Sequence, residues 1–198
     1  MISSRTSRRS APRRIIGRLV PAAAVAATAL VALPALAQVY WTVPDVLKSF
    51  FSRSSKVGFK TVTLTDAQTK EIGKQLGSGP VKRDWTVYVA SSEGGAKRDG
   101  YALVDDEKGM HEPIDFAVQF GRDGCVERVE ILVYREPYGD EVRQARYRDQ
   151  FKGKCAHDPI TAGRDIDIVS GASISSKSVA FGVKRDTLVL QAAVGNGL

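Results

Sequence analysis

Acidic residues are absent from the first 37 residues of this 198-residue chain, although six arginines lie there. The whole chain has 29 Lys and Arg against 22 Asp and Glu, which gives a net charge of +7. Beyond residue 37 the two signs nearly balance, so the basic excess does not predict a nucleic-acid surface. A composition of 43% hydrophobic and 26% charged residues excludes a disordered chain and predicts a globular core.

Charge is also missing between Arg18 and Asp45, and the run over 19–37 is mostly Ala, Val and Leu, ending in Ala-Leu-Ala. Arginines before an apolar run with small residues at its end predict a signal peptide over residues 1–37. An uncleaved membrane anchor over residues 15–41 is the alternative, because about 20 apolar residues can span a bilayer. Both alternatives place the rest of the chain in the periplasm or another extracytoplasmic compartment, since the arginine-rich flank stays inside.

Cysteine and histidine are scarce. Cys125 and Cys155 are the only cysteines, and no Cys-x-x-Cys pattern is present, which argues against a zinc site and covalent haem. An oxidising compartment would permit them to pair, but two cysteines do not make a disulfide framework, so both states stay open. His111 and His157 are the only histidines, and each lies in a polar turn rather than in a segment typical of a catalytic base.

Hydrophobic periodicity predicts strands followed by helices. Residues 38–62 read as a connecting stretch with a short helix over 45–51, and Thr65 begins a second helix with a capping-box pattern. Period-two alternation predicts strands over 85–90, 101–104, 114–120 and 129–133. Residues 140–151 have helical tendency, and a final helix is expected over 174–191, with Val179, Val183, Thr187, Leu190 and Val194 on one face.

These elements predict an α+β fold, an antiparallel sheet with helices packed on it. We expect three parts: the signal peptide or anchor over 1–37, an N-terminal extension with a short helix over 38–84, and one domain over 85–198.

The segment before the final helix is rich in small and hydroxyl residues. Such residues at a helix start predict a phosphate site, because free N–H groups and the helix dipole attract anions, although ordinary helix capping is an alternative. Two hydrolase motifs fail here by one residue. The Gly-x-Ser-x-Gly motif would need a glycine at position 175, which is Ser175. The Ser-x-x-Lys motif would need a serine three residues before Lys177, where Ile174 stands.

The run Asp167-x-x-Ser170-Gly171-Ala172-Ser173 resembles the Asp-x-x-Ser/Thr-Gly-Ala-Thr motif of the covalent FMN-binding domain. That family includes extracytoplasmic subunits of Na⁺-translocating NADH:quinone oxidoreductase and Rnf complexes. The resemblance implies that Ser173 is esterified to the phosphate of FMN, delivered from FAD by a Mg²⁺-dependent flavin transferase. Serine stands at this position where the family usually has threonine.

Two shorter matches precede the motif in the family's order, so that the resemblance covers about residues 100–191. Glu136-Pro-Tyr-Gly139 resembles the family's Glu-Thr-Pro-Gly, and Gln150-Phe151-Lys-Gly153 its Gln-Phe-x-Gly. The resemblance implies that the residues around the Ser173 ester bind the cofactor: Tyr134, Glu136, Gly139, Asp167, Ser170, Gly171, Ala172, Ile174, Ser175, Ser176 and Lys177.

The function implied is that of an exported flavoprotein, which transfers electrons between a membrane donor and an extracytoplasmic acceptor. Its partners would be the flavin transferase and a membrane redox protein, without nucleic acid. Tyr134, Tyr138 and Phe151 are candidates for packing on the flavin. The alternatives are an exported binding or assembly module that has the fold without flavin and, third, an exported serine hydrolase. No Gly-x-Gly-x-x-Gly follows a strand, so oxidation of NADH by this chain itself is not expected.

Overall fold

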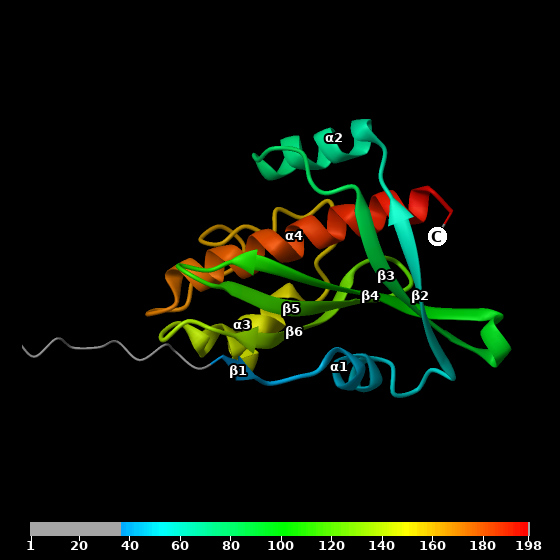
Figure 1. The fold of residues 1–198 in the computed structure, drawn as a ribbon, viewed down its shortest axis with the longest axis horizontal. Helices are drawn as coiled ribbons and strands as arrows, with labels where there is room; N and C mark the ends of the chain where they lie inside the picture. Colours follow the sequence, from blue (N-terminus) through cyan, green and yellow to red (C-terminus); the bar gives the residue numbers. More distant parts are fainter. Residues whose placement is uncertain (1–36, 198) are drawn as a thin grey trace, which may run out of the picture. The chain divides into compact units, whose positions relative to one another are not determined.

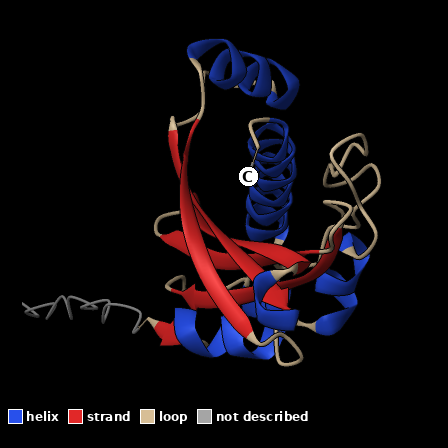
Figure 2. Ribbon diagram, turned by 90° about the vertical axis from the view of Figure 1, so that its right-hand side faces the viewer, coloured by secondary structure: helices blue, strands red, loops and turns tan. Residues whose placement is uncertain are grey.

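The computed structural model describes residues 37–197. The predicted signal peptide (1–37) and the alternative anchor (15–41) lie outside this part of the chain, apart from their last residues. Six antiparallel strands form one sheet in the order β1-β6-β5-β4-β3-β2, with helices packed on it (Figures 1 and 2). The expected α+β fold is therefore confirmed. Within 37–197, no helix combines the length and hydrophobicity needed to cross a bilayer.

The strands are β1 Gln38–Val39, β2 Lys56–Thr63, β3 Asp84–Ser92, β4 Lys97–Lys108, β5 Pro113–Phe120 and β6 Val126–Tyr134. The α-helices are α1 Val43–Phe50, α2 Asp66–Leu76, α3 Ala145–Arg148 and α4 Ser173–Gly195. Three 3₁₀ turns complete the structure: η1 Glu93–Gly95, η2 Asp140–Arg143 and η3 Asp149–Phe151.

The four predicted strands lie inside β3 to β6, and the predicted final helix lies inside α4. The capping box at the start of α2 is present, because the Thr65 hydroxyl accepts from the N–H of Gln68, whose side chain accepts from the N–H of Thr65. The helix expected over 45–51 begins earlier, at Val43, with Thr42 as its N-cap. The segment over 140–151 is divided among η2, α3 and η3 instead of forming one helix.

Strand β2 was not expected from the sequence, which indicated a connecting stretch over 38–62. It is the edge strand of the sheet and pairs with β3 along its whole length. Most of its side chains are exposed on both faces, so it lacks the apolar alternation that identifies a half-buried strand. At the opposite edge, the two residues of β1 pair with the end of β6.

Helix α4 covers one face of the sheet with a closely packed apolar side. Val179, Val183 and Leu190 are fully buried there, as the spacing predicts, whereas Val194 is 42% exposed and lies off the buried side. At Gly182 a Cβ atom would come within 2.3 Å of the Phe116 ring on β5. The absence of a side chain at Gly182 is what allows the helix to approach the strand.

Helix α1 covers part of the opposite face, where alanine side chains come from three neighbouring strands. Ala90, Ala102 and Ala117 are fully buried beneath Val46 and Phe50 of the helix. Small side chains on the sheet let the backbone of α1 lie close to it. Helices α4 and α1 therefore lie on opposite faces of the sheet (Figure 1), and each packs on its own apolar cluster.

Cys125 and Cys155 form a disulfide, which answers the question that the sequence left open. The bond joins the residue before β6 to the loop that follows η3. It closes a segment of the chain that includes β6 and all three short helical elements over 140–151.

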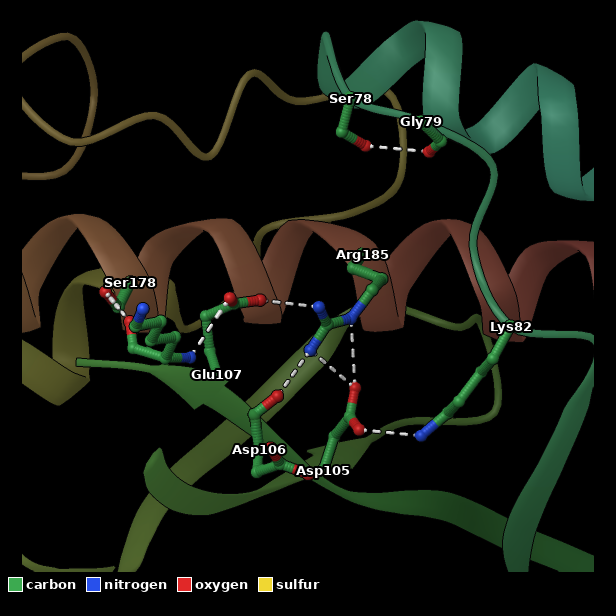
Figure 3. Close-up of polar contacts among 9 residues, drawn as sticks. Ser78, Gly79, Lys82, Asp105, Asp106, Glu107, Ser178 and Arg185 are labelled. Atoms are coloured by element: carbon green, nitrogen blue, oxygen red, sulfur yellow. Dashed lines mark hydrogen bonds and ion pairs between the residues drawn. The ribbon is translucent and has the colours of Figure 1, made fainter. Parts of the chain in front are cut away.

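A cluster of charged side chains joins the middle of α4 to β4 (Figure 3). The Arg185 guanidinium lies 2.7 Å from Asp105 Oδ2 and also pairs with Glu107, while Lys82 Nζ lies 2.9 Å from Asp105 Oδ1. Next to it, Asp186 is fully buried, and no N–H or O–H donor within 37–197 reaches either carboxyl oxygen. Burial and the neighbouring negative charge of Asp105 raise the pKa of Asp186 well above the usual range of an aspartate.

Candidate functional site

The first residue of α4 is Ser173, whose side chain is exposed. Within the described part of the chain, no side chain caps this helix start, and Ala172 occupies the N-cap position. The first backbone N–H groups of a helix have no partner inside the helix, so here they remain available to an anion. Gly171 has a φ of +84°, a left-handed conformation that bends the chain into the helix.

The two serines that follow turn inward rather than toward solvent. Ser175 Oγ lies 2.7 Å from Tyr134 Oη, and both side chains are buried. Ser176 is fully buried, and its hydroxyl accepts from the N–H of Val169 at 3.2 Å. Ser175 and Ser176 therefore connect the start of α4 to the core through hydrogen bonds. Among these three serines, Ser173 is the one that faces outward.

Tyr134, at the end of β6, connects the Glu136–Gly139 motif to the start of α4. Its hydroxyl donates to the carbonyl of Tyr138 at 2.6 Å, so in the contact with Ser175 it is the serine that donates. Gly139 has a φ of +98°, and a Cβ atom there would lie 2.5 Å from Tyr134 Oη and 2.7 Å from Ser175 Oγ. Glycine is therefore required at Gly139 for both conformation and space.

Glu136 forms hydrogen bonds with the turn between β4 and β5. Its carboxylate accepts from the backbone N–H groups of His111 and Glu112, in the turn between β4 and β5. Burial alone would raise the pKa of Glu136, but these N–H donors outweigh burial and hold its pKa below the ordinary value. Glu136 thus holds the loop after β6 to the turn between β4 and β5. This turn lies at the end of the sheet where α4 begins (Figure 1).

The Gln150–Gly153 motif contacts the Asp167–Ser173 motif. The backbone N–H of Asp167 donates to Gln150 Oε1 at 2.6 Å. A pocket of about 380 Å³ lies beside this pair, lined in part by Arg146, Ile168 and Ser170. Asp167 and Ser170 are exposed, so the acidic start of the motif is accessible from solvent.

The aromatic candidates differ in exposure. Tyr134 and Phe151 are buried in the core, where Phe151 packs edge-on against Tyr147 with ring centroids 5.4 Å apart. Tyr138 is 83% exposed. Lys177, one turn after Ser173, is also exposed and lines a pocket of about 300 Å³.

Apolar side chains are exposed on several segments around the start of α4. Ile174 is 45% and Ile168 37% exposed, beside the motif, while Met110 is 59% exposed in the turn that Glu136 braces. The α4 helix contacts the end of β4 that leads into this turn, since Ser178 Oγ donates to the carbonyl of Lys108 at 2.6 Å.

Glu141 belongs to this site and was not identified from the sequence. Its Oε2 atom is buried and has no hydrogen-bond partner within 37–197, and its Oε1 lies 3.9 Å from the Cβ position of Gly171. It lies two residues after Gly139, outside the three motifs, and no local pattern distinguishes it from the other acidic residues.

Comparison with known proteins agrees with these motifs. Residues 109–186 match the model of the FMN-binding domain family, which confirms the resemblance inferred from the motif. The chain is 33% identical over 112 residues to a subunit of the proton-translocating ferredoxin:NAD(+) oxidoreductase complex of Clostridium ljungdahlii. This match covers 52% of the chain and 58% of that relative, less than two thirds of its length.

The crystal structure of Shewanella oneidensis NqrC has a similar fold, with a TM-score of 0.51 and 18% sequence identity. The similarity covers 74% of this chain and 88% of the NqrC chain.

Proposed function

From the match of residues 109–186 to the FMN-binding domain family, we propose that this protein carries FMN as a covalent phosphoester on Ser173 and transfers electrons. The observation that carries the proposal is the geometry of Ser173. Its exposed hydroxyl stands at an uncapped helix start, in a segment that the neighbouring motifs hold in place.

The residues at the start of α4 fit a flavin phosphate. Unpaired N–H groups and the positive end of the helix dipole favour its charge, and Lys177 offsets that charge from one turn away. Ile174 and Tyr138 offer exposed apolar surface to the ring. FMN supplies the electron-transfer chemistry when bound, while the protein positions it and excludes water from part of the ring.

Attachment requires one displacement at phosphorus. The Ser173 oxygen attacks the phosphorus on the riboflavin side of FAD, an Oγ–P bond forms, and the P–O bond of the pyrophosphate breaks. AMP leaves, and the serine proton passes to a base. We propose that a Mg²⁺-dependent flavin transferase performs this step, because an accessible hydroxyl at the helix start is what such an enzyme must reach.

The partners and the compartment are part of the same proposal. The Clostridium relative is, by its name, a component of an oxidoreductase complex, and we propose a membrane redox protein as the electron donor or acceptor here. The apolar run over 19–37 and its arginine-rich flank support an extracytoplasmic location. The Cys125–Cys155 disulfide agrees with an oxidising compartment.

Co-expression of the full chain with a flavin transferase tests the attachment. We expect a fluorescent band on a denaturing gel and the added mass of FMN on the peptide that contains Ser173. Ser173→Ala should abolish both signals, and Ser173→Thr should retain them because the hydroxyl is kept. Ser178→Ala, on the same helix, is the matched control and should be modified normally.

Modification of the Ser173→Ala variant at another residue would contradict the assignment. A folded but unmodified wild-type chain in its native host would contradict the flavoprotein function and favour the module without flavin.

A further inference from the structure

Positive charge is concentrated at the start of the described part of the chain. Residues 38–60 carry Lys48, Arg53, Lys56 and Lys60 against the single acid Asp45, whereas residues 61–198 carry 19 bases and 21 acids. Residues 38–198 together are almost neutral, so this short segment holds the basic excess. The segment includes α1 and the first half of β2.

Exposed apolar side chains lie in the same segment. Val39, at one edge of the sheet, is 64% exposed, and Phe59, at the other edge, is 71% exposed. Val39 pairs across β1 and β6 with Val133, and Phe59 pairs across β2 and β3 with Tyr88. Cross-strand partners face the same side of a sheet, and Val133 and Tyr88 both pack in the α1 cluster.

A groove between α1 and β2 connects these features. It has a volume of about 630 Å³, with Lys48 and Lys56 among the residues at its edge. Its apolar lining comes from Val43, Pro44, Leu47, Phe51, Val57, Phe59 and Tyr88. We call the surface formed by Val39, this groove and its two lysines the α1 face.

We propose that the α1 face rests on an anionic lipid bilayer. Phosphate headgroups attract Lys48 and Lys56, and side chains such as Phe59 enter the boundary between headgroups and acyl chains. The apolar run over 19–37 ends immediately before β1, so any association of that run with a bilayer would bring β1, and Val39 with it, close to the headgroups. The proposal does not depend on flavin.

Binding of the α1 face to a bilayer would determine which way the α4 side of the sheet faces. Helices α1 and α4 lie on opposite faces of the sheet (Figures 1 and 2). With the α1 face on the bilayer, the layer that contains α4 is turned away from the lipid, where a partner in the aqueous compartment can approach it.

Tryptophan quenching in vesicles tests the proposal with the full chain. In phosphatidylglycerol vesicles with brominated acyl chains, Phe59→Trp should add fluorescence that the bromine quenches. Val194→Trp, also at an exposed apolar position but on α4, is the matched control and should remain unquenched. In zwitterionic phosphatidylcholine vesicles the quenching of the tryptophan at position 59 should be weaker.

Charge variants test the electrostatic part. In the Phe59→Trp background, Lys48→Gln and Lys56→Gln should each shift the equilibrium between the docked and free face about fivefold, which corresponds to about 1 kcal/mol. Lys70→Gln and Lys74→Gln, exposed on α2, should leave the quenching unchanged. Unquenched tryptophan at position 59, equal quenching at position 194, or insensitivity to lipid charge would each overturn the proposal.

Discussion

At the residue scale, Gly139 is the position where space is most restricted near the candidate site. Gly139→Ala places a methyl group against Tyr134 Oη and Ser175 Oγ and strains a φ of +98°. We expect a loss of about 2–3 kcal/mol in the free energy of unfolding. Urea unfolding followed by circular dichroism measures the loss.

The matched control for this substitution is Gly124→Ala. Gly124 also has a positive φ, of +79°, but apart from its two chain neighbours no described residue has an atom within 4 Å of a Cβ placed there. Only backbone strain of about 1 kcal/mol is expected for this control. Equal losses in the two variants would show that the contacts with Tyr134 and Ser175 are unimportant.

The linear motifs indicated which residues lie near the start of α4, but not which of their side chains turn inward. Ser173, Gly171 and Lys177 lie at or beside the start of α4, as the motif indicated. Ser175 and Tyr134 are also close to it, but a linear motif does not reveal which hydroxyls turn inward. That distinction depends on the packing of β6 against α4, which is a long-range property.

At the scale of the element, the Cys125–Cys155 disulfide holds the start of β6 against the loop after η3. The sequence separation between the cysteines is 30 residues. Closing a loop of that size restricts the unfolded chain and stabilises the fold by about 3–4 kcal/mol. We expect reductant to lower the urea midpoint correspondingly.

The double variant Cys125→Ser/Cys155→Ser provides the control for reduction. Its urea midpoint should match that of the reduced wild type and should not respond to reductant. A midpoint for the oxidised wild type no higher than that of the double variant would refute the stabilising role.

Strands β5 and β2 show which elements the sequence could predict. In β5, Phe116, Val118 and Phe120 alternate with more polar neighbours and face the α4 layer, so the period of two is visible. In β2, Lys56 to Thr63 are mostly exposed, and the strand depends on hydrogen bonds to β3. A pattern of hydrophobicity cannot detect a strand that buries little.

At the scale of the whole molecule, Asp186 makes the stability depend on pH. Its pKa is raised in the folded protein, so the folded state holds a proton that the unfolded state releases at lower pH. Stability contributed by protonated Asp186 is therefore lost as pH rises from the ordinary carboxyl range toward the raised pKa. We expect the Asp186→Asn variant to lose less stability than wild type between pH 5 and pH 8.

Urea midpoints at the two pH values measure this difference. Asn has the shape of a neutral aspartic acid and can donate to Asp105, so the ion-pair cluster with Arg185 and Lys82 should persist. An identical change of midpoint in wild type and variant would mean that folding does not raise the pKa of Asp186 into or above this range.

The contacts that join the three motifs form when the chain folds, before any cofactor could be attached. Tyr134, Ser175 and Gln150 hold the Ser173 segment in place through hydrogen bonds within the chain itself, without any cofactor. Folding alone therefore creates the local structure around Ser173. Under the proposed attachment of FMN, modification would report on folding, because a chain that has not brought β6 to α4 does not present the Ser173 hydroxyl in this setting.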